Sequence, residues 1–301
     1  MGHTHRSSAS PPGGDADGST VRPVQNAEAR TEWQQAVADH PFWYHTMDLA
    51  PGVTTPGWFD LRPVVDKMPW PDLVGKRCLD IGTYDGYLAF EMEKRGAAEV
   101  HAIDIEDHDL WDWPPDARPS VVGRDVRTAG FRGPKKGDGF RLASKILDSK
   151  VQWHAVSIYD LNPELLGMFD VITIGTLLLH LRDPVGALEA VRSVCAGHLM
   201  SSEQIELWLS IAHRGRPIYR LNGSGQDCQW WLANARGHWQ LLYSAGFEIE
   251  KQSKPYIVEF NVHPKPQRTP FHLVRRAVLR VLAGTANPGI FHRALLARPR
   301  V

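Results

Sequence analysis

The segment Leu79-Asp-Ile-Gly-Thr-Tyr-Asp-Gly-Tyr87 constrains the fold of this chain more than any other part of the sequence. It continues a predicted strand, Arg77–Ile81, and leads into apolar residues at helical spacing between Tyr87 and Lys94. Gly82 and Gly86 punctuate the turn, where glycine adopts backbone angles closed to other residues and lets a ligand approach the main chain. A strand, a glycine turn and a helix in this order favour a nucleoside-binding α/β fold.

The same alternation of strands and helices continues along the chain. Further strands are expected at residues 99–104, 151–157, 169–175 and 198–203, and helices at 140–147, from Asp183-Pro184 onward, and at 235–245. This order predicts an α/β fold: a Rossmann-like, doubly wound sheet, mostly parallel, with helices on both faces. Two extended runs, Phe247–Glu250 and Tyr256–Val262, are expected to pair as an antiparallel final hairpin.

Composition divides the chain into four segments. Residues 1–30 are rich in Ser, Gly, Pro and Asp, and we expect a disordered leader there because little apolar surface is available for burial. Residues 31–75 are dense in aromatic side chains and are interpreted as a lid or cap over the α/β domain at 76–262. Residues 263–301 are predicted to form a basic, amphipathic extension.

Asp104 ends the second predicted strand, about 20 residues after the glycine turn, where an acid can accept hydrogen bonds from both hydroxyls of a ribose. The turn lacks the Gly-x-Gly-x-x-Gly spacing of NAD enzymes and offers few N–H groups for a pyrophosphate, which disfavours a dehydrogenase. Over residues 74–262 the chain resembles the class I S-adenosylmethionine-dependent methyltransferases. The matching positions are Asp80, Gly82, Asp85 and Gly86 in the first motif and Asp104 as the ribose acid.

This resemblance implies that the cofactor is S-adenosylmethionine and assigns further residues to its site. Ser157 and Ile158 stand where the family's third-strand loop brackets adenine, and Gly175 opens a fourth-strand motif that ends at His180. The resemblance is nearly silent on the acceptor, because this fold hosts methylation of oxygen, nitrogen, carbon and sulfur.

Two side chains are candidates for activating the acceptor. His180 lies at the mouth of the predicted sheet, and an imidazole suits proton removal; alternatively it only shapes the pocket. Glu203 ends the fifth predicted strand and is placed to reach an acceptor hydroxyl; alternatively it pairs with Arg182. Both interpretations stay open for both residues.

Aromatic segments on either side of these strands are expected to bind the acceptor. The candidate acceptor-binding residues are His45, Trp58 and Arg62 before the first strand, and Trp230, Trp231 and Asn234 after the fifth. The first group would close over the methionine moiety and exclude water from the transfer, and the tryptophans of the second would stack on a planar or sugar-like acceptor. Packing of these aromatic residues within the protein is the alternative.

The net charge and the distribution of basic residues bear on three possible functions. The chain carries 34 basic and 34 acidic residues, which favours a small-molecule or glycan acceptor methylated at oxygen or nitrogen. A tRNA-modifying enzyme is the alternative, because the aromatic leader partly resembles that of tRNA wobble-uridine carboxymethyl-transfer enzymes and the segment after Glu259 is strongly basic. Residues 271–282 have the pattern of a basic amphipathic helix that lies on a membrane surface or on RNA. A non-catalytic nucleoside-binding module is the third function.

Other features exclude several classes of protein. The three cysteines are far apart and form no Cys-x-x-Cys pair, and the histidines and carboxylates are scattered, so we expect no metal site. There is no apolar stretch of about 20 residues and no apolar secretory-signal region near the first residues, so we expect a cytoplasmic protein.

Overall fold

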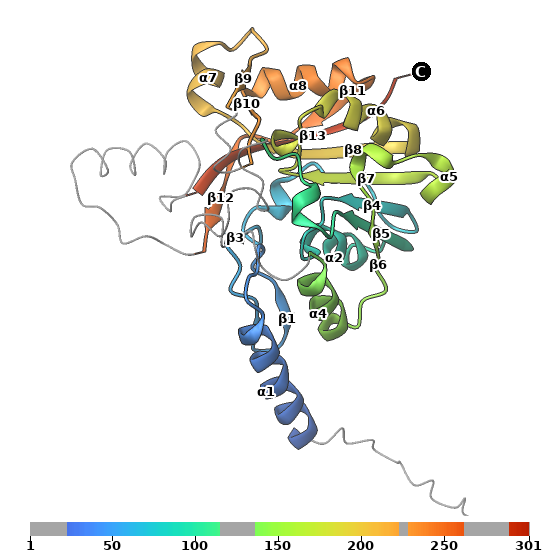
Figure 1. Cartoon of the computed structure of the whole chain (residues 1–301), viewed down its shortest axis with the longest axis vertical. Coiled ribbons are helices and arrows are strands. Elements are labelled where there is room, and N and C mark those ends of the chain that lie inside the picture. The colour runs from blue at the N-terminus through green and yellow to red at the C-terminus, as the bar shows by residue number, and fades with distance from the viewer. Residues whose placement is uncertain (1–22, 115–135, 223–227, 262–288, 301) are drawn as a thin grey trace, which may run out of the picture.

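The computed structural model describes residues 23–114, 136–222, 228–261 and 289–300. Its centre is a nine-stranded sheet with the order β3-β12-β13-β8-β7-β4-β5-β6, in which β11 also pairs with β13 (Figure 1). The strands are β3 (Phe59–Asp60), β4 (Arg77–Ile81), β5 (Glu99–Asp104), β6 (Gln152–Ala155), β7 (Phe169–Gly175), β8 (Cys195–Gln204), β11 (Phe247–Gln252), β12 (Tyr256–Phe260) and β13 (Gly289–Pro299). From β6 to β8 all neighbours are parallel, and the remaining pairs are antiparallel.

Helices cover both faces of this sheet, as the doubly wound prediction requires. The helices are α1 (Pro23–Asp39), α2 (Tyr87–Lys94), α4 (Asp138–Leu147), α5 (Pro163–Leu166), α6 (Pro184–Val194), α7 (Leu207–Ala212) and α8 (Ala235–Ser244). Apolar side chains of α2 and α4 join one buried core, whereas those of α6 and α8 join a second core on the opposite face. Successive side chains of β4 point to opposite faces of the sheet, so this strand contributes to both cores: Cys78 belongs to the first and Leu79 to the second.

The antiparallel part of the sheet differs in its pairing from the expected hairpin. The strands β11 and β12 do not pair with each other; each pairs with β13, which lies between β8 and β12. The prediction of a separate basic extension is therefore wrong for residues 289–299, which form an inner strand of the main sheet. The helix expected at 271–282 lies outside the described residues.

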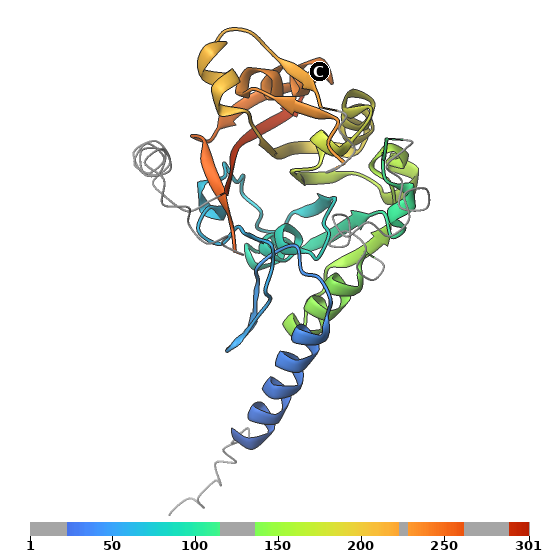
Figure 2. The same cartoon turned by 60° about the vertical axis from the view of Figure 1, so that its left-hand side comes forward.

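The segment before β4 is folded against the domain. A helix begins at Pro23, so the prediction of disorder is wrong for residues 23–30, and residues 1–22 lie outside the described residues. Short strands β1 (Asp48–Ala50) and β2 (Val53–Thr54) pair with each other, and β3 extends the main sheet by pairing with β12. Figures 1 and 2 show α1 projecting away from the sheet on the side of α4.

Candidate active site

The glycine turn after β4 has the backbone that its sequence predicts. Gly82 and Gly86 have φ values of +71° and +99°, in the left-handed region that favours glycine. A Cβ on Gly86 would lie 2.4 Å from Cε2 of Phe90 and 2.7 Å from Cδ2 of Phe140, so this position also needs glycine for space. The turn places the first residues of α2 against the carboxyl end of β4.

Asp104, the expected ribose acid, ends β5 beside this turn. One carboxylate oxygen, Oδ2, accepts a hydrogen bond of 2.8 Å from the backbone N–H of Tyr84. The other, Oδ1, accepts from the backbone N–H of Ile105 at 2.7 Å and from the ammonium of Lys136 at 2.8 Å. The side chain of Asp104 is only 6% exposed, so these partners hold its charge in a largely dry place.

Asp80 precedes the glycine turn in the chain, whereas Asp104 follows it, and Asp80 is also buried. Its Oδ1 accepts a hydrogen bond of 2.6 Å from the hydroxyl of Thr173 on β7. Burial raises the pKa of Asp80 to about 6, against which the Thr173 hydrogen bond acts. The carboxyl group lines the cavity described below.

Asp85 joins the turn to the segment before β4. Its Oδ2 accepts hydrogen bonds from the backbone N–H groups of Tyr44 at 2.8 Å and His45 at 2.9 Å, and its Oδ1 contacts Nδ1 of His45. The structure thus brings together Asp85 from the first motif and His45 from the lid segment, two residues that are expected to bind different ligands.

A small cavity of about 40 Å³ opens between this turn, the ends of β7 and β8, and the antiparallel strands. Its lining residues are Tyr44, His45, Phe59, Leu61, Met68, Asp80, Gly82, Thr83, Leu88, Gly175, Thr176, Ser202, Val258, Ile290 and His292. The lining is mostly apolar, and a few hydroxyl, carboxyl and imidazole groups converge on it, as in small-molecule sites. Of the expected residues, Asp80, Gly82, Gly175 and His45 line it.

His292 is a site residue that sequence reasoning missed, because it lies on β13 in the segment expected to be an extension. Its Nδ1–H donates to the carbonyl of Ile290 at 2.9 Å, and its Nε2 lies 3.0 Å from the hydroxyl of Thr176. Burial lowers the pKa of His292 to about 4, so the imidazole is neutral near pH 7. Thr176 itself has a φ of +53°, a strained angle for a β-branched residue and one that often marks a functional site.

The two candidates for acceptor activation are not among the residues that line the cavity. His180 ends the 3-10 helix η6 (Leu178–His180), and its Nδ1 donates to the carbonyl of Cys228 at 2.7 Å. Glu203 is fully buried, and its Oε1 accepts from the backbone N–H groups of Leu177 at 3.2 Å and Leu178 at 3.3 Å. Burial raises the pKa of Glu203 to about 8, which makes it a mostly neutral group at pH 7.

The alternative pairing of Glu203 with Arg182 is wrong. The backbone N–H of Arg182 donates to the carboxylate of Asp112, and its guanidinium donates to the carbonyl of Trp113 at 2.9 Å. Glu203 instead holds the start of η6 through its contacts with the backbone. Its role in the structure is to position the loop after β7.

Ser157 and Ile158, expected beside adenine, follow β6 at the same edge of the sheet. The Ser157 hydroxyl accepts from the backbone N–H of Tyr159 at 3.3 Å and caps the 3-10 helix η5 (Ile158–Asp160). Ile158 is buried and joins the second core. Gly175 ends β7, where an added Cβ would lie 2.9 Å from Cδ1 of Leu88.

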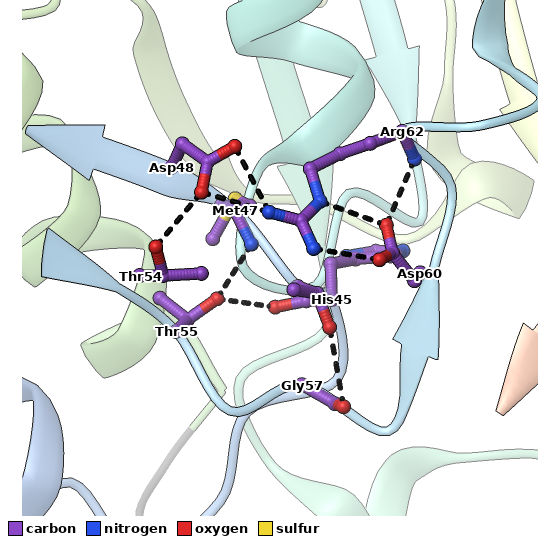
Figure 3. A network of polar contacts seen from close by, with 9 residues as sticks. His45, Met47, Asp48, Thr54, Thr55, Gly57, Asp60 and Arg62 are labelled. Atoms are coloured by element: carbon purple, nitrogen blue, oxygen red, sulfur yellow. Dashed lines mark hydrogen bonds and ion pairs between the residues drawn. The ribbon is translucent and has the colours of Figure 1, made fainter. Parts of the chain in front are cut away.

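Two of the expected lid residues are not among those that line this cavity. Arg62 donates to both Asp48 and Asp60, and its side chain is 37% exposed (Figure 3). Trp58 is 45% exposed and lies edge-on to Phe42. The structure therefore gives Arg62 a role in holding the segment before β4 together, and the acceptor contacts of Arg62 and Trp58 stay predictions.

The aromatic loop before α8 packs against η6. The indole N–H of Trp230 donates to the carbonyl of Asp112, and that of Trp231 donates to the carbonyl of Leu181 at 3.1 Å. Asn234 is fully buried at the start of α8, where its Oδ1 accepts from the N–H groups of Gly237 and Ile218 and its amide donates to two carbonyls. Because these contacts use the whole amide group, the expected acceptor contact of Asn234 is wrong.

The basic residues of the last segment that the structure describes are part of the fold. Arg298 pairs with Glu248 across β11 and β13, and the guanidinium of Arg300 lies 4.0 Å from the ring centre of Tyr243. Within the described ranges, no three or more His, Cys, Asp or Glu residues are grouped to hold a metal ion. No helix in the part of the chain that the structure describes is long and apolar enough to cross a membrane.

The comparison with known families agrees with this geometry. A model of the Methyltransferase domain family matches residues 60–252, more than half of the chain. The chain belongs to this family and is a class I S-adenosylmethionine-dependent methyltransferase, so the enzyme class and the cofactor expected from the first motif are confirmed. No curated protein matches it in sequence.

Solved structures that resemble the chain are distant. An S-adenosylmethionine-dependent methyltransferase from Mesorhizobium loti is 16% identical with a TM-score of 0.42, and the match covers 76% of this chain and 93% of that one. The 1,6-didemethyltoxoflavin-N1-methyltransferase of Burkholderia thailandensis is 14% identical with a TM-score of 0.45, covering 95% and 94%. Magnesium protoporphyrin IX methyltransferase from Synechocystis is 15% identical with a TM-score of 0.43, covering 96% and 90%. At this distance we transfer no substrate from them.

Proposed function

We propose that this methyltransferase acts on a small-molecule or glycan acceptor, at oxygen or nitrogen. The observation that carries the proposal is the small cavity between the glycine turn and the antiparallel strands. Its mostly apolar lining is of the kind found in sites for small organic molecules, and its hydroxyl and imidazole groups can hold the O–H or N–H that becomes methylated. The cavity must widen from about 40 Å³ to admit such an acceptor.

The donor site in this proposal lies along the carboxyl ends of β4, β5 and β6. Gly82 and Gly86 let the amino-acid part of the donor approach the main chain near the start of α2, and Asp104 accepts the ribose hydroxyls. Ser157 and Ile158 stand beside the adenine. Asp80 lies where the cavity meets the glycine turn, so the sulfonium methyl group would face the cavity.

The acceptor side of the site uses Thr176 and His292 in preference to His180 and Glu203. Thr176 and His292 line the cavity and contact each other, whereas His180 and Glu203 are bonded to backbone groups outside its lining. In the reaction, the acceptor heteroatom bonds to the methyl carbon, the electrons of the S–CH₃ bond go to sulfur, and the acceptor loses one proton. Nε2 of the neutral His292 accepts a hydrogen bond from the Thr176 hydroxyl, and the Thr176 oxygen then accepts a hydrogen bond from that O–H or N–H and orients it for in-line transfer. The proton that the acceptor loses goes to solvent.

The tRNA alternative loses part of its support. It requires a basic surface that joins Arg124, Arg127, Lys135 and Lys136 to the last segment. Lys136 is only 9% exposed and is bonded to Asp104 inside the protein, and the other three residues lie outside the described ranges.

A labelling experiment tests the proposal. The purified protein is incubated with methyl-labelled S-adenosylmethionine and with small phenols, sugar alcohols and amines, in parallel with bulk tRNA and with purified glycans. We expect label in a small-molecule or glycan fraction and none in tRNA. Label confined to tRNA would overturn the proposal and establish the alternative.

A further inference from the structure

Lys136 makes an unusual set of contacts beside the proposed donor site. Its ammonium lies 2.8 Å from Oδ1 of Asp104, 4.2 Å from the ring centre of Trp111 and 4.7 Å from that of Tyr84. The Lys136 and Asp104 side chains are 9% and 6% exposed. One carboxylate and two aromatic rings therefore hold the Lys136 ammonium in a place with little water, where each of these attractions is strong.

The same carboxylate is the proposed acceptor for the ribose of the donor. Oδ2 of Asp104 is used by the N–H of Tyr84, and Oδ1 by the N–H of Ile105 and by Lys136. The two backbone contacts come from the glycine turn and from the residue after β5, so they belong to the fold. The Lys136 contact is the one that a side chain can give up.

The aromatic wall behind Lys136 is held independently of it. Trp111 stacks on Trp113 with ring centres 5.6 Å apart, and the indole N–H of Trp113 donates to the carbonyl of His108 at 2.7 Å. The neighbouring Asp112 accepts from the hydroxyl of Tyr159 at 2.6 Å and from the backbone N–H of Arg182 at 2.8 Å. Removing the ammonium would therefore leave Trp111 and its loop in place.

We propose that Lys136 is a built-in competitor of the methyl donor, because its ammonium binds the carboxylate of Asp104 that the donor's ribose must engage. This inference rests on the proposed donor site. Three of the roughly four acceptor positions of the carboxylate are in use, so binding of both ribose hydroxyls requires the Lys136–Asp104 contact to open. The free energy of that contact is then subtracted from the affinity for the donor. Lys136 in this way sets the donor concentration at which the enzyme becomes occupied.

Calorimetric titration with S-adenosylhomocysteine tests the competition without any acceptor. Lys136→Met keeps most of the unbranched side chain and removes its charge, and it should lower the Kd by about tenfold. Lys136→Gln is a second variant in case the methionine variant folds poorly. Lys145→Met, which changes an exposed lysine on α4, is the matched control and should bind as the wild type does.

A double variant tests whether Lys136 affects donor binding through Asp104. With Asp104→Asn in the background, Lys136→Met should no longer tighten binding, because the ribose and the lysine have lost their common partner. An unchanged or higher Kd for both Lys136 variants, with normal binding by the wild type, would overturn the competition and leave the donor site standing. If neither the wild type nor any variant binds S-adenosylhomocysteine, the proposed donor site fails and this inference fails with it.

Discussion

The Oδ2 atom of Asp85 accepts a hydrogen bond of 2.8 Å from the backbone N–H of Tyr44, across 41 positions of sequence. This contact, with the one from the N–H of His45, fastens the segment before β4 to the glycine turn. The wall of the cavity formed by Tyr44 and His45 therefore depends on a first-motif residue, and the turn and the wall are expected to move together.

Asp85→Asn tests this connection. The change removes the charge but lets the amide carbonyl still accept from the backbone N–H groups of Tyr44 and His45, so these become weaker, neutral hydrogen bonds and we expect a loss of about 2 kcal/mol in the free energy of unfolding. Faster amide hydrogen exchange at residues 44 and 45 should accompany it. The measurement is urea denaturation with hydrogen exchange, and Asp148→Asn at an exposed left-handed position is the control. Equal losses in the two variants would argue against a special role for Asp85.

A glycine comparison tests the geometry of the turn. Gly86→Ala would place a Cβ 2.4 Å from Phe90 at a φ of +99°, whereas Gly75→Ala at +72° meets nothing within 4 Å. We expect a loss of about 3 kcal/mol or more for Gly86→Ala, from backbone strain and overpacking, and about 1 kcal/mol for Gly75→Ala from strain alone. Thermal denaturation of both variants measures the difference. If Gly75→Ala is the more damaging, the packing described around α2 is wrong.

The raised pKa of Glu203 predicts that the folded protein loses stability as the pH rises. Burial raises the pKa of this carboxyl group to about 8 in the folded protein, well above its value in an unfolded chain. The folded state therefore binds a proton that the unfolded state releases, and this contribution is present below pH 4.5 and is lost as the pH rises through 8. Its size is on the order of 4 kcal/mol.

Glu203→Gln should remove this dependence, because the glutamine carbonyl can still accept from Leu177 and Leu178 without carrying a charge. Urea denaturation between pH 5 and pH 9 is the measurement, and Glu189→Gln on the exposed side of α6 is the control. The assignment would be refuted by a Glu203→Gln protein that loses stability toward pH 9 as steeply as the wild type does.

The lowered pKa of His292 predicts that the folded protein loses stability as the pH falls. Its folded pKa of about 4 lies below the ordinary value of 6.5, so between these values the unfolded state binds the proton and the folded state does not. Stability should therefore fall as the pH drops from 6.5 toward 4, by on the order of 3 kcal/mol from this residue. His292→Asn should show a shallower decline, whereas His213→Asn at an exposed position should not. Parallel curves for the His292 variant and the wild type would contradict a neutral buried imidazole.

Much of the parallel half of the fold could be predicted from local sequence. The strands β4, β5 and β7 appear with the expected bounds because each is a short apolar run between a turn and an acid or glycine, and Gly82 and Gly86 mark the turn by their backbone needs. Asp183 and Pro184 likewise mark the start of α6, where the Asp183 carboxylate accepts from the N–H of Gly186 at 2.9 Å.

The rest depends on contacts between distant segments. The strand β13 follows β12 only after a long stretch of chain, and its residues, with Arg293 and Arg298 among them, resemble a basic amphipathic segment more than an inner strand. No local signal places His292 beside Thr176. In the same way, Asn234 looks like a binding residue in sequence, and only the carbonyls of His213 and Arg216 show that its amide serves the fold.

The central claim is that Asp104 and the glycine turn bind the methyl donor, and calorimetric titration of S-adenosylhomocysteine into the wild type and Asp104→Asn tests it most directly. We predict saturable binding to the wild type and a Kd at least about tenfold higher for Asp104→Asn, since a hydrogen bond to a charged group is worth roughly 1.5–3 kcal/mol. Equal affinity in the two proteins, or no binding to the wild type, would contradict the account.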